Sequence, residues 1–125
     1  MAHILLVDDD ASIRSSLSRV LETHGHAVEP VEDGQLALAR LRLGAYDLVI
    51  TDINMPEATG IEVLAHVYEL SPNVPVIAMS GGGRVLDKGS LLGDAFALGA
   101  AATIEKPIEI VEFVALVEKV LSDGA

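Results

Sequence analysis

The chain has 125 residues, half of them apolar, contains no cysteine and carries a formal net charge of −11. This length suits one compact domain, so we predict a single domain over residues 1–125. A surface this acidic repels nucleic acid and anionic lipid. We therefore expect neither direct nucleic-acid binding nor membrane contact.

The sequence also bears on membrane segments and cellular location. No run of about 18 uncharged apolar residues occurs, so no segment is expected to span a membrane. Residues 1–4 lack the basic region of a signal peptide, and we expect none. The absence of cysteine excludes disulfides and thiol chemistry, which fits a cytoplasmic location.

Short apolar runs alternate with helix-like stretches along the chain. The apolar runs are rich in β-branched residues and occupy residues 4–7, 27–31, 47–51, 74–79 and 101–104, the second being weaker. Continuous runs of this length predict strands buried on both faces, as in a parallel sheet. Apolar residues recur at helical spacing within 13–21, 61–67 and 110–121, and turn signals separate the two kinds of segment.

Five strand–helix alternations in one small chain predict an α/β fold with a doubly wound, five-stranded parallel sheet. Right-handed crossovers then place helices on both faces of the sheet. In such sheets the functional site lies at the carboxyl ends of the strands, near the switch in strand order. The residues that directly follow each apolar run are therefore the candidates for function.

Chemically useful side chains follow four of the five predicted strands. They are Asp8, Asp9 and Asp10 after the first, Asp52 and Asn54 after the third, Ser80 and Gly81 after the fourth, and Glu105, Lys106 and Pro107 after the fifth. Crowded carboxylates repel one another unless a cation compensates, and Mg²⁺ favours a few carboxylates together with water and phosphate oxygens. This pattern predicts a magnesium site, with Mn²⁺ as an alternative ion.

Phosphoryl transfer accounts for the other residues of this set. Lys106 and Ser80 supply the positive charge and the hydrogen-bond donor that phosphoryl oxygens require. Asp52 would be the nucleophile, because an aspartate can attack phosphorus to form an acyl phosphate. Gly81 leaves room for water or a phosphodonor, and the glycines after Ser80 allow the backbone to move.

Several polar and aromatic residues have an ordinary structural explanation. Asp10 precedes the predicted helix 11–23 and is expected to be its N-cap. Lys106 alone would be a solvated lysine. His24 and His26 flank a turn and are expected to be solvated, whereas Tyr46 and Phe113 are expected in the core. The conjunction of four strand ends is what favours function.

Taken together, these motifs resemble the receiver domain of bacterial response regulators over essentially the whole chain. The matching features are the acidic pair Asp8-Asp9, the phosphoacceptor segment around Asp52 with Met55-Pro56, the Ser80 hydroxyl and Lys106-Pro107. The resemblance implies a flavodoxin-like sheet of strand order 2-1-3-4-5. It also implies that Asp9, Asp52 and the Asn54 carbonyl bind Mg²⁺ directly, that Asp8 binds it directly or through water, and that the Lys106–Pro107 peptide is cis.

The resemblance further implies a role and partners. The role is that of a signalling switch rather than an enzyme. Such a switch catalyses only its own phosphorylation and dephosphorylation. The donor would be a sensor histidine kinase, a histidine phosphotransfer protein or a small phosphodonor. Phosphorylation would change the helix 4–strand 5–helix 5 surface that binds an output protein of unknown identity.

Two departures from the family pattern affect how a signal would leave the domain. Thr103 stands where the last strand usually carries Tyr or Phe, so the aromatic part of the usual switch is missing. The stretch 80–99 is also a few residues longer than usual. Two alternatives stay open: a degenerate receiver that serves as a phosphorylation-independent scaffold, and an aspartate-nucleophile phosphatase. The latter lacks its second acid, because Asn54 occupies that position.

Overall fold

The computed structural model describes residues 2–52, 67, 69, 73–80 and 100–123, with the backbone alone at residue 80. The elements in chain order are β1 (His3–Val7), α1 (Ala11–Thr23), β2 (Ala27–Val31), α2 (Gly34–Leu43), β3 (Leu48–Asp52), β4 (Val76–Ser80), β5 (Ala102–Glu105) and α5 (Ile110–Asp123). The predicted helix at 61–67 lies outside these residues except for Val67, which is helical and fully buried. No helix in this part of the chain is long and apolar enough to cross a bilayer.

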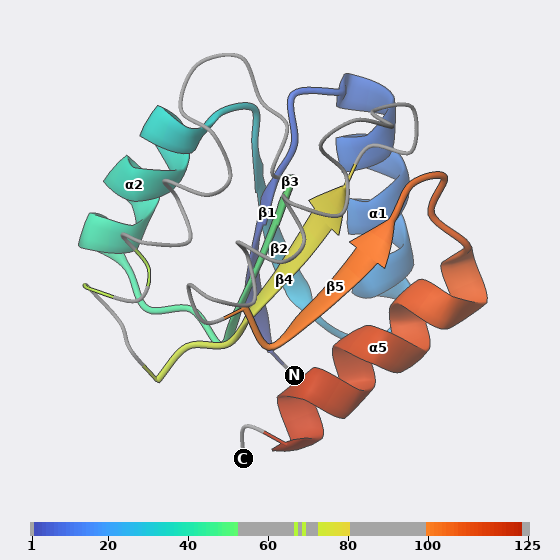
Figure 1. The fold of residues 1–125 in the computed structure, drawn as a ribbon. Coiled ribbons are helices and arrows are strands. Elements are labelled where there is room, and N and C mark those ends of the chain that lie inside the picture. Colours follow the sequence, from blue (N-terminus) through green and yellow to red (C-terminus); the bar gives the residue numbers. More distant parts are fainter. Residues whose placement is uncertain (1, 53–66, 68, 70–72, 81–99, 124–125) are drawn as a thin grey trace.

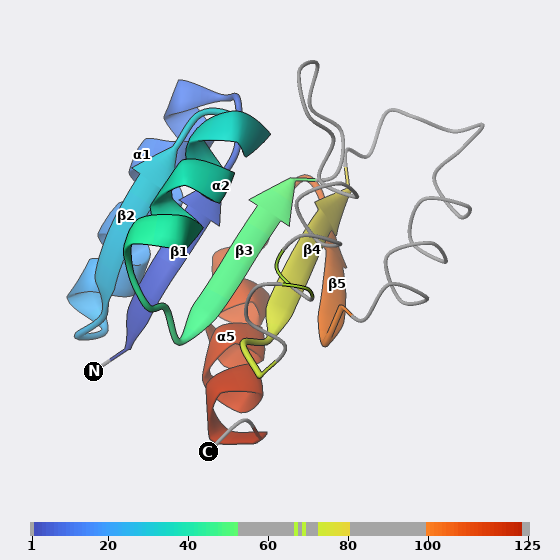
Figure 2. The ribbon, with the colours of Figure 1, turned by 90° about the vertical axis from the view of Figure 1, so that its left-hand side faces the viewer.

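The sheet has five parallel strands in the order β2-β1-β3-β4-β5, which confirms the predicted fold class and strand order. The arrows of β2, β3 and β4 point the same way in Figure 2. Strand β2 has the predicted bounds, and those of the other strands differ from the prediction by one or two residues. Strand β4 begins at Val76 rather than at residue 74, because Pro75 has no N–H to give to a ladder.

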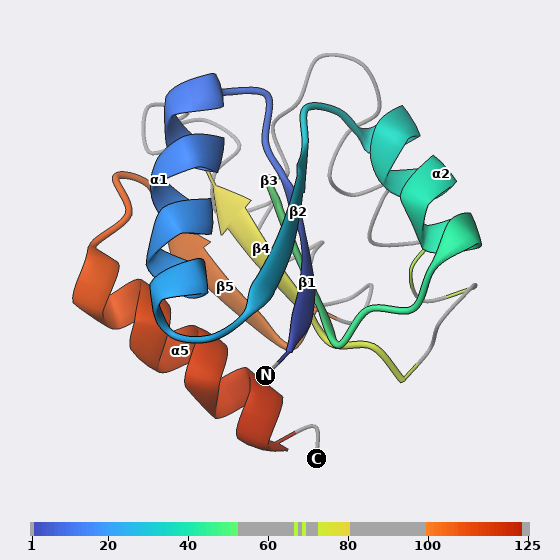
Figure 3. The same ribbon diagram turned by 180° about the vertical axis from the view of Figure 1, so that it is seen from behind.

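Helices cover both faces of the sheet, as the fold class requires. Helix α2 lies on one face, whereas α1 and α5 lie together on the other (Figures 1 and 3). Successive β1 residues alternate between the two resulting cores: Leu5 and Val7 pack toward α2, and Ile4 and Leu6 pack toward α1 and α5. Both faces of the central strands are therefore buried, which explains their continuous apolar sequences.

Local hydrogen bonds define both ends of α1. The Asp10 carboxylate accepts from the backbone N–H groups of Ser12, at 2.8 Å, and Ile13, at 3.3 Å, which confirms its predicted N-cap role. At the other end, Gly25 N–H donates to the Glu22 carbonyl and His26 N–H to the Leu21 carbonyl. This pair of bonds is a Schellman motif, which needs a left-handed residue after the cap. Gly25 supplies it with φ of 89°.

Replacing Gly25 by alanine is expected to lower the free energy of unfolding by about 1–2 kcal/mol, because a Cβ disfavours left-handed backbone. No atom lies within 4 Å of the new Cβ, so the cost comes from conformation alone. Urea unfolding followed by circular dichroism measures it. Gly44→Ala is the matched control: Gly44 ends α2 with φ of −146° and tolerates a side chain. Equal effects of the two substitutions would contradict the argument.

The expectation that both turn histidines are solvated is correct for His24 and wrong for His26. The His26 side chain is only 8% exposed. Its Nε2 lies 3.0 Å from Oε1 of Glu118 on α5, and its Nδ1 accepts from Ala2 N–H at 3.2 Å. This contact buries the imidazole. The acidic partner is 92 residues away in sequence, so no local pattern could have indicated it.

Tyr46 confirms the prediction that it belongs to the core. Its ring is buried in the cluster beneath α2 and lies 4.5 Å from the His3 ring, centroid to centroid. Its hydroxyl donates to Glu29 Oε1 at 2.9 Å, and Arg40 Nε lies 3.0 Å from the other oxygen of Glu29. Burial raises the pKa of Tyr46 to about 12, and the hydrogen bond and charge of Glu29 act in the same direction.

This shift predicts a loss of stability in alkali. The unfolded chain ionises its tyrosines near pH 10, whereas folded Tyr46 resists ionisation until about pH 12. The contribution of Tyr46 is therefore complete below pH 10 and is lost as pH rises through the folded pKa, by about 2–3 kcal/mol. Urea unfolding at stepped pH measures it, with ultraviolet absorbance of tyrosinate in a Tyr68→Phe background reporting Tyr46. The same loss in Tyr46→Phe would assign it to other groups.

Candidate functional site

The strand register brings the predicted residues to one edge of the sheet. Val7 on β1 pairs with Thr51 on β3, so Asp8 and Asp52 follow at adjacent positions. Asp52 pairs in turn with Met79 on β4, and Ser80 pairs with Glu105 on β5. Lys106 directly follows β5. The ends of four strands thus meet here because parallel strands in register all end on the same side.

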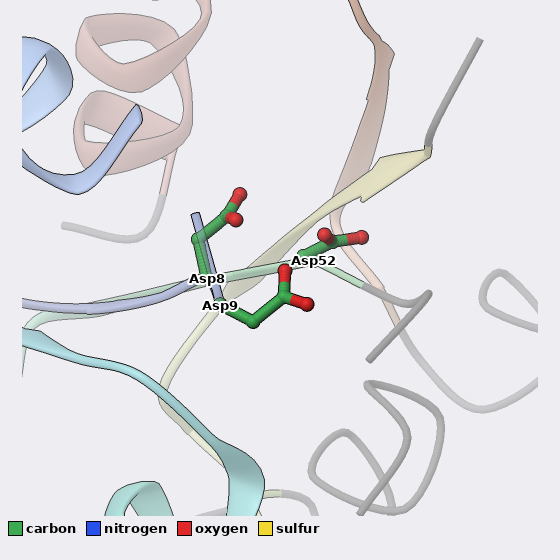
Figure 4. Close-up of side chains that lie close together, drawn as sticks. All are labelled: Asp8, Asp9 and Asp52. Carbon is green, nitrogen blue, oxygen red and sulfur yellow. The ribbon is translucent and has the colours of Figure 1, made fainter. Parts of the chain in front are cut away.

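Three carboxylates gather at this edge, from Asp8, Asp9 and Asp52 (Figure 4). One ligand oxygen of each lies within 4.8 Å of the others. Asp8 is 0% exposed and Asp52 is 3% exposed, whereas Asp9 is open to solvent. Two buried acids and one accessible acid thus form an acidic cluster that solvent reaches at Asp9.

Lys106 joins the two buried carboxylates. Its Nζ lies 2.8 Å from Asp8 Oδ2 and 2.9 Å from Asp52 Oδ2. The side chain is 17% exposed, so the ion pairs are largely removed from water. Charge-assisted contacts of this kind are strong when both partners are desolvated. The prediction that Lys106 belongs to the site rather than to open solvent is therefore consistent with its position.

Burial and ion pairing oppose each other at Asp8 and at Lys106, and the pKa of each group ends above its ordinary value. Burial raises the pKa of Asp8, although Lys106 and the Asp10 N–H oppose that shift. Burial by itself would lower the pKa of Lys106, but its bonds to Asp8 and Asp52 outweigh burial and raise it. The ammonium is consequently retained at neutral pH. One cation among three carboxylates leaves an excess of negative charge.

This excess meets the chemical requirement of a hard divalent cation. Mg²⁺ takes oxygen ligands and is held by one or two carboxylates together with water or phosphate. The cluster offers oxygens within 4.8 Å of one another, one of them accessible from solvent. The donor set therefore fits Mg²⁺, and its acidity explains part of the net charge of −11.

Several other predicted residues can be located. Thr103 is half-buried on β5, level with Ala78 of β4, and the Lys106–Pro107 peptide is cis, as the resemblance implies. Ser80 ends β4, but its side chain lies outside the described residues, as do Asn54, Gly81 and the remainder of the stretch 80–99.

One neighbour of the site, Arg14, was not predicted from the sequence. Arg14, on the first turns of α1, donates from Nη1 to the backbone carbonyl of Asp8 at 2.8 Å. The acceptor is a main-chain carbonyl, which every residue has, so the residue types do not indicate this hydrogen bond. Only the packing of α1 beside β1 reveals the contact.

The fold and this site are those of a known class of signalling domain. The sequence matches the response regulator receiver domain family over residues 4–118, and the chain belongs to that family.

Individual relatives are consistent with this assignment. A transcriptional regulatory protein, the CpxR homolog of Haemophilus influenzae, is 37% identical over all of this chain and 52% of its own length. FixJ of Bradyrhizobium diazoefficiens is 34% identical over 95% of this chain and 56% of its own length. The receiver protein CpdR of Brucella abortus is 33% identical over 97% of this chain and 98% of its own length. The chain thus spans about half of the first two relatives.

A solved structure gives the same result for the fold. The CheY-like receiver domain protein of Methanospirillum hungatei superimposes with a TM-score of 0.91 at 27% identity, covering 99% of this chain and 96% of that one.

Proposed function

We propose that this chain is a phosphoacceptor switch of two-component signalling, phosphorylated on Asp52 with the help of Mg²⁺. The observation that carries the proposal is the position of Lys106, whose Nζ contacts both buried carboxylates. A lysine in this position can bind an oxygen of a phosphoryl group that is attached to Asp52. A scaffold would gain nothing from burying two acids and a lysine together, because such groups are costly to desolvate.

The chemistry of the chain's own residues follows from their places. A carboxylate oxygen of Asp52 attacks phosphorus, and the bond between phosphorus and the donor atom breaks as the acyl phosphate forms. Lys106 then exchanges its contact with Asp52 for a phosphoryl oxygen, while keeping Asp8 as its second partner. The Ser80 hydroxyl donates to another phosphoryl oxygen.

The ion would be held by the carboxylates of Asp8, Asp9 and Asp52 and by the backbone carbonyl of Asn54. When bound, Mg²⁺ neutralises charge on the phosphoryl oxygens. Asp9 is the acid that solvent reaches directly, so it would meet the incoming ion first.

The partners belong to the same proposal. A histidine kinase or a histidine phosphotransfer protein supplies the phosphoryl group, and an output protein reads the surface around helix 4, β5 and α5. Thr103 in place of an aromatic residue means that the usual ring rotation does not carry the signal here. Absence of direct DNA binding, a cytoplasmic location and a single domain over residues 1–125 stay predictions.

Intact-mass spectrometry after incubation with acetyl phosphate and Mg²⁺ tests the central step. We expect a gain of one phosphoryl group, absent from Asp52→Asn and absent when EDTA is added. Asn replaces a carboxylate oxygen by an amide while keeping the shape of the side chain, so it is the matched control.

Three other results would contradict the proposal in different ways. Equal phosphorylation of Asp52→Asn would place the acceptor elsewhere. No gain in any sample, together with no transfer from a phosphorylated histidine phosphotransfer protein, would favour the scaffold. Repeated turnover of an external phosphate ester would favour the phosphatase.

A further inference from the structure

We infer that Arg14 is a positioning residue for the metal site, which orients Asp9 by holding the peptide unit between Asp8 and Asp9. The inference rests on the proposed function and adds a residue to its machinery. Its basis is the 2.8 Å bond from Arg14 Nη1 to the Asp8 carbonyl.

The two members of the acidic pair are held very differently. Asp8 is held at three atoms: its N–H donates to the Val31 carbonyl, its Oδ1 accepts from Asp10 N–H, and its Oδ2 lies 2.8 Å from Lys106 Nζ. Asp9 is exposed, and among residues 2–52, 73–80 and 100–123 its carboxylate makes no hydrogen bond or ion pair. Within the described part of the chain, the direction of the Asp9 side chain is therefore set by its backbone.

The backbone of Asp9 is set by the group that Arg14 holds. The Asp8 carbonyl and the Asp9 N–H belong to one rigid, planar peptide unit. Fixing the carbonyl oxygen fixes the plane of that unit and so limits the direction in which the Asp9 side chain leaves the chain. Repulsion from Asp8 and Asp52 would otherwise drive the Asp9 carboxylate out toward water.

Arg14 is suited to this role because α1 fixes the backbone from which its side chain extends. It is half-buried on α1, and its backbone N–H donates to the Asp10 carbonyl at 3.0 Å. Asp10 caps the same helix and donates its own N–H to Asp8. Helix α1, its cap and the acidic pair thus form one continuous network, and the guanidinium is a rigid donor on a long stem.

The charge of Arg14 predicts the opposite effect from its hydrogen bond, which makes the inference testable. A cation near an acidic cluster repels Mg²⁺, so removing that charge alone should tighten binding. Loss of the bond should weaken binding, because groups that orient metal ligands contribute roughly tenfold or more to affinity. The sign of the change separates the two effects.

The experiment measures Mg²⁺ affinity by calorimetry in the wild-type chain and in R14Q, R14K and R19Q. Arg19 lies on the same helix, is exposed and has no side-chain partner within the described part of the chain, so R19Q removes the same charge without touching the acidic pair. We expect R14Q to bind Mg²⁺ about tenfold more weakly, R14K to lie between R14Q and wild type, and R19Q to bind as wild type or slightly more tightly.

Two further readouts separate positioning from general damage to the fold. In EDTA, the NMR order parameter of the Asp9 amide should fall in R14Q and not in R19Q. At saturating Mg²⁺, the rate of phosphorylation by acetyl phosphate should return to the wild-type value in R14Q, because the nucleophile and Lys106 are intact.

Wild-type Mg²⁺ affinity in R14Q, or in R14K if R14Q does not fold, would overturn the inference and leave the proposed function standing. A wild-type chain that binds no Mg²⁺ would overturn both. Calorimetry distinguishes these outcomes because it does not depend on phosphorylation.

Discussion

Replacing Lys106 by methionine is expected to slow phosphorylation of Asp52 by about a hundredfold or more, the usual cost of losing one group that stabilises developing charge. The same substitution should tighten Mg²⁺ binding, because it removes an ammonium 2.8 Å from Asp8 and 2.9 Å from Asp52. Methionine keeps most of the apolar stem, so packing changes little. Phosphorylation rates measured across a Mg²⁺ titration report both quantities in one experiment.

The control is Lys119→Met on the exposed side of α5, which removes the same charge far from the site and should leave both quantities unchanged. In EDTA, Lys106→Met should also be less stable than wild type by about 3 kcal/mol, because two buried carboxylates lose their shared cation. Weaker Mg²⁺ binding in Lys106→Met would contradict the argument, since it would mean that Lys106 maintains the shape of the site rather than its charge balance.

Replacing Phe113 by alanine is expected to lower the free energy of unfolding by about 3–5 kcal/mol. The ring is 0% exposed and is the largest fully buried side chain among the described residues. It packs from α5 into the core shared with α1 and with β1, β3 and β4. A loss of this size is a large part of the total stability of a small domain, and urea unfolding followed by circular dichroism measures it.

Val111→Ala provides the matched control on the same helix. Val111 is 74% exposed, and its truncation should change stability by no more than about 0.5 kcal/mol. An effect below about 1 kcal/mol for Phe113→Ala would mean that α5 does not pack against the sheet in solution.

The five strands, the helices α1 and α5, and the residue types that follow the strands are predictable from the sequence, whereas α2 (Gly34–Leu43) was not among the predicted helices. The buried strands are recognisable because a strand covered on both faces must be apolar throughout. Asp10 is recognisable as a cap because its partners, Ser12 and Ile13, are its near neighbours in the chain. Asp8, Asp9, Asp52 and Lys106 could be grouped in advance because parallel strands bring their carboxyl ends to one edge.

The partners of polar side chains that pair across the fold are visible only in the tertiary structure. His26 is buried by Glu118, Tyr46 donates to Glu29, and Lys106 divides its contact between Asp8 and Asp52. These partners lie between 17 and 98 residues apart, the last figure being 106 − 8. Side chains so distant in sequence meet only because strand register and helix packing bring them together. Local sequence patterns therefore do not predict these contacts.

The contact of Arg14 is the clearest example of one that the sequence does not predict. Its residue type is ordinary for an early turn of a helix, and its acceptor is a backbone carbonyl that every residue possesses. The contact exists because α1 starts three residues after Asp8 and runs back along the sheet beside β1 and β2. The role we infer for Arg14 depends on the orientation of one peptide plane, which no local sequence pattern indicates.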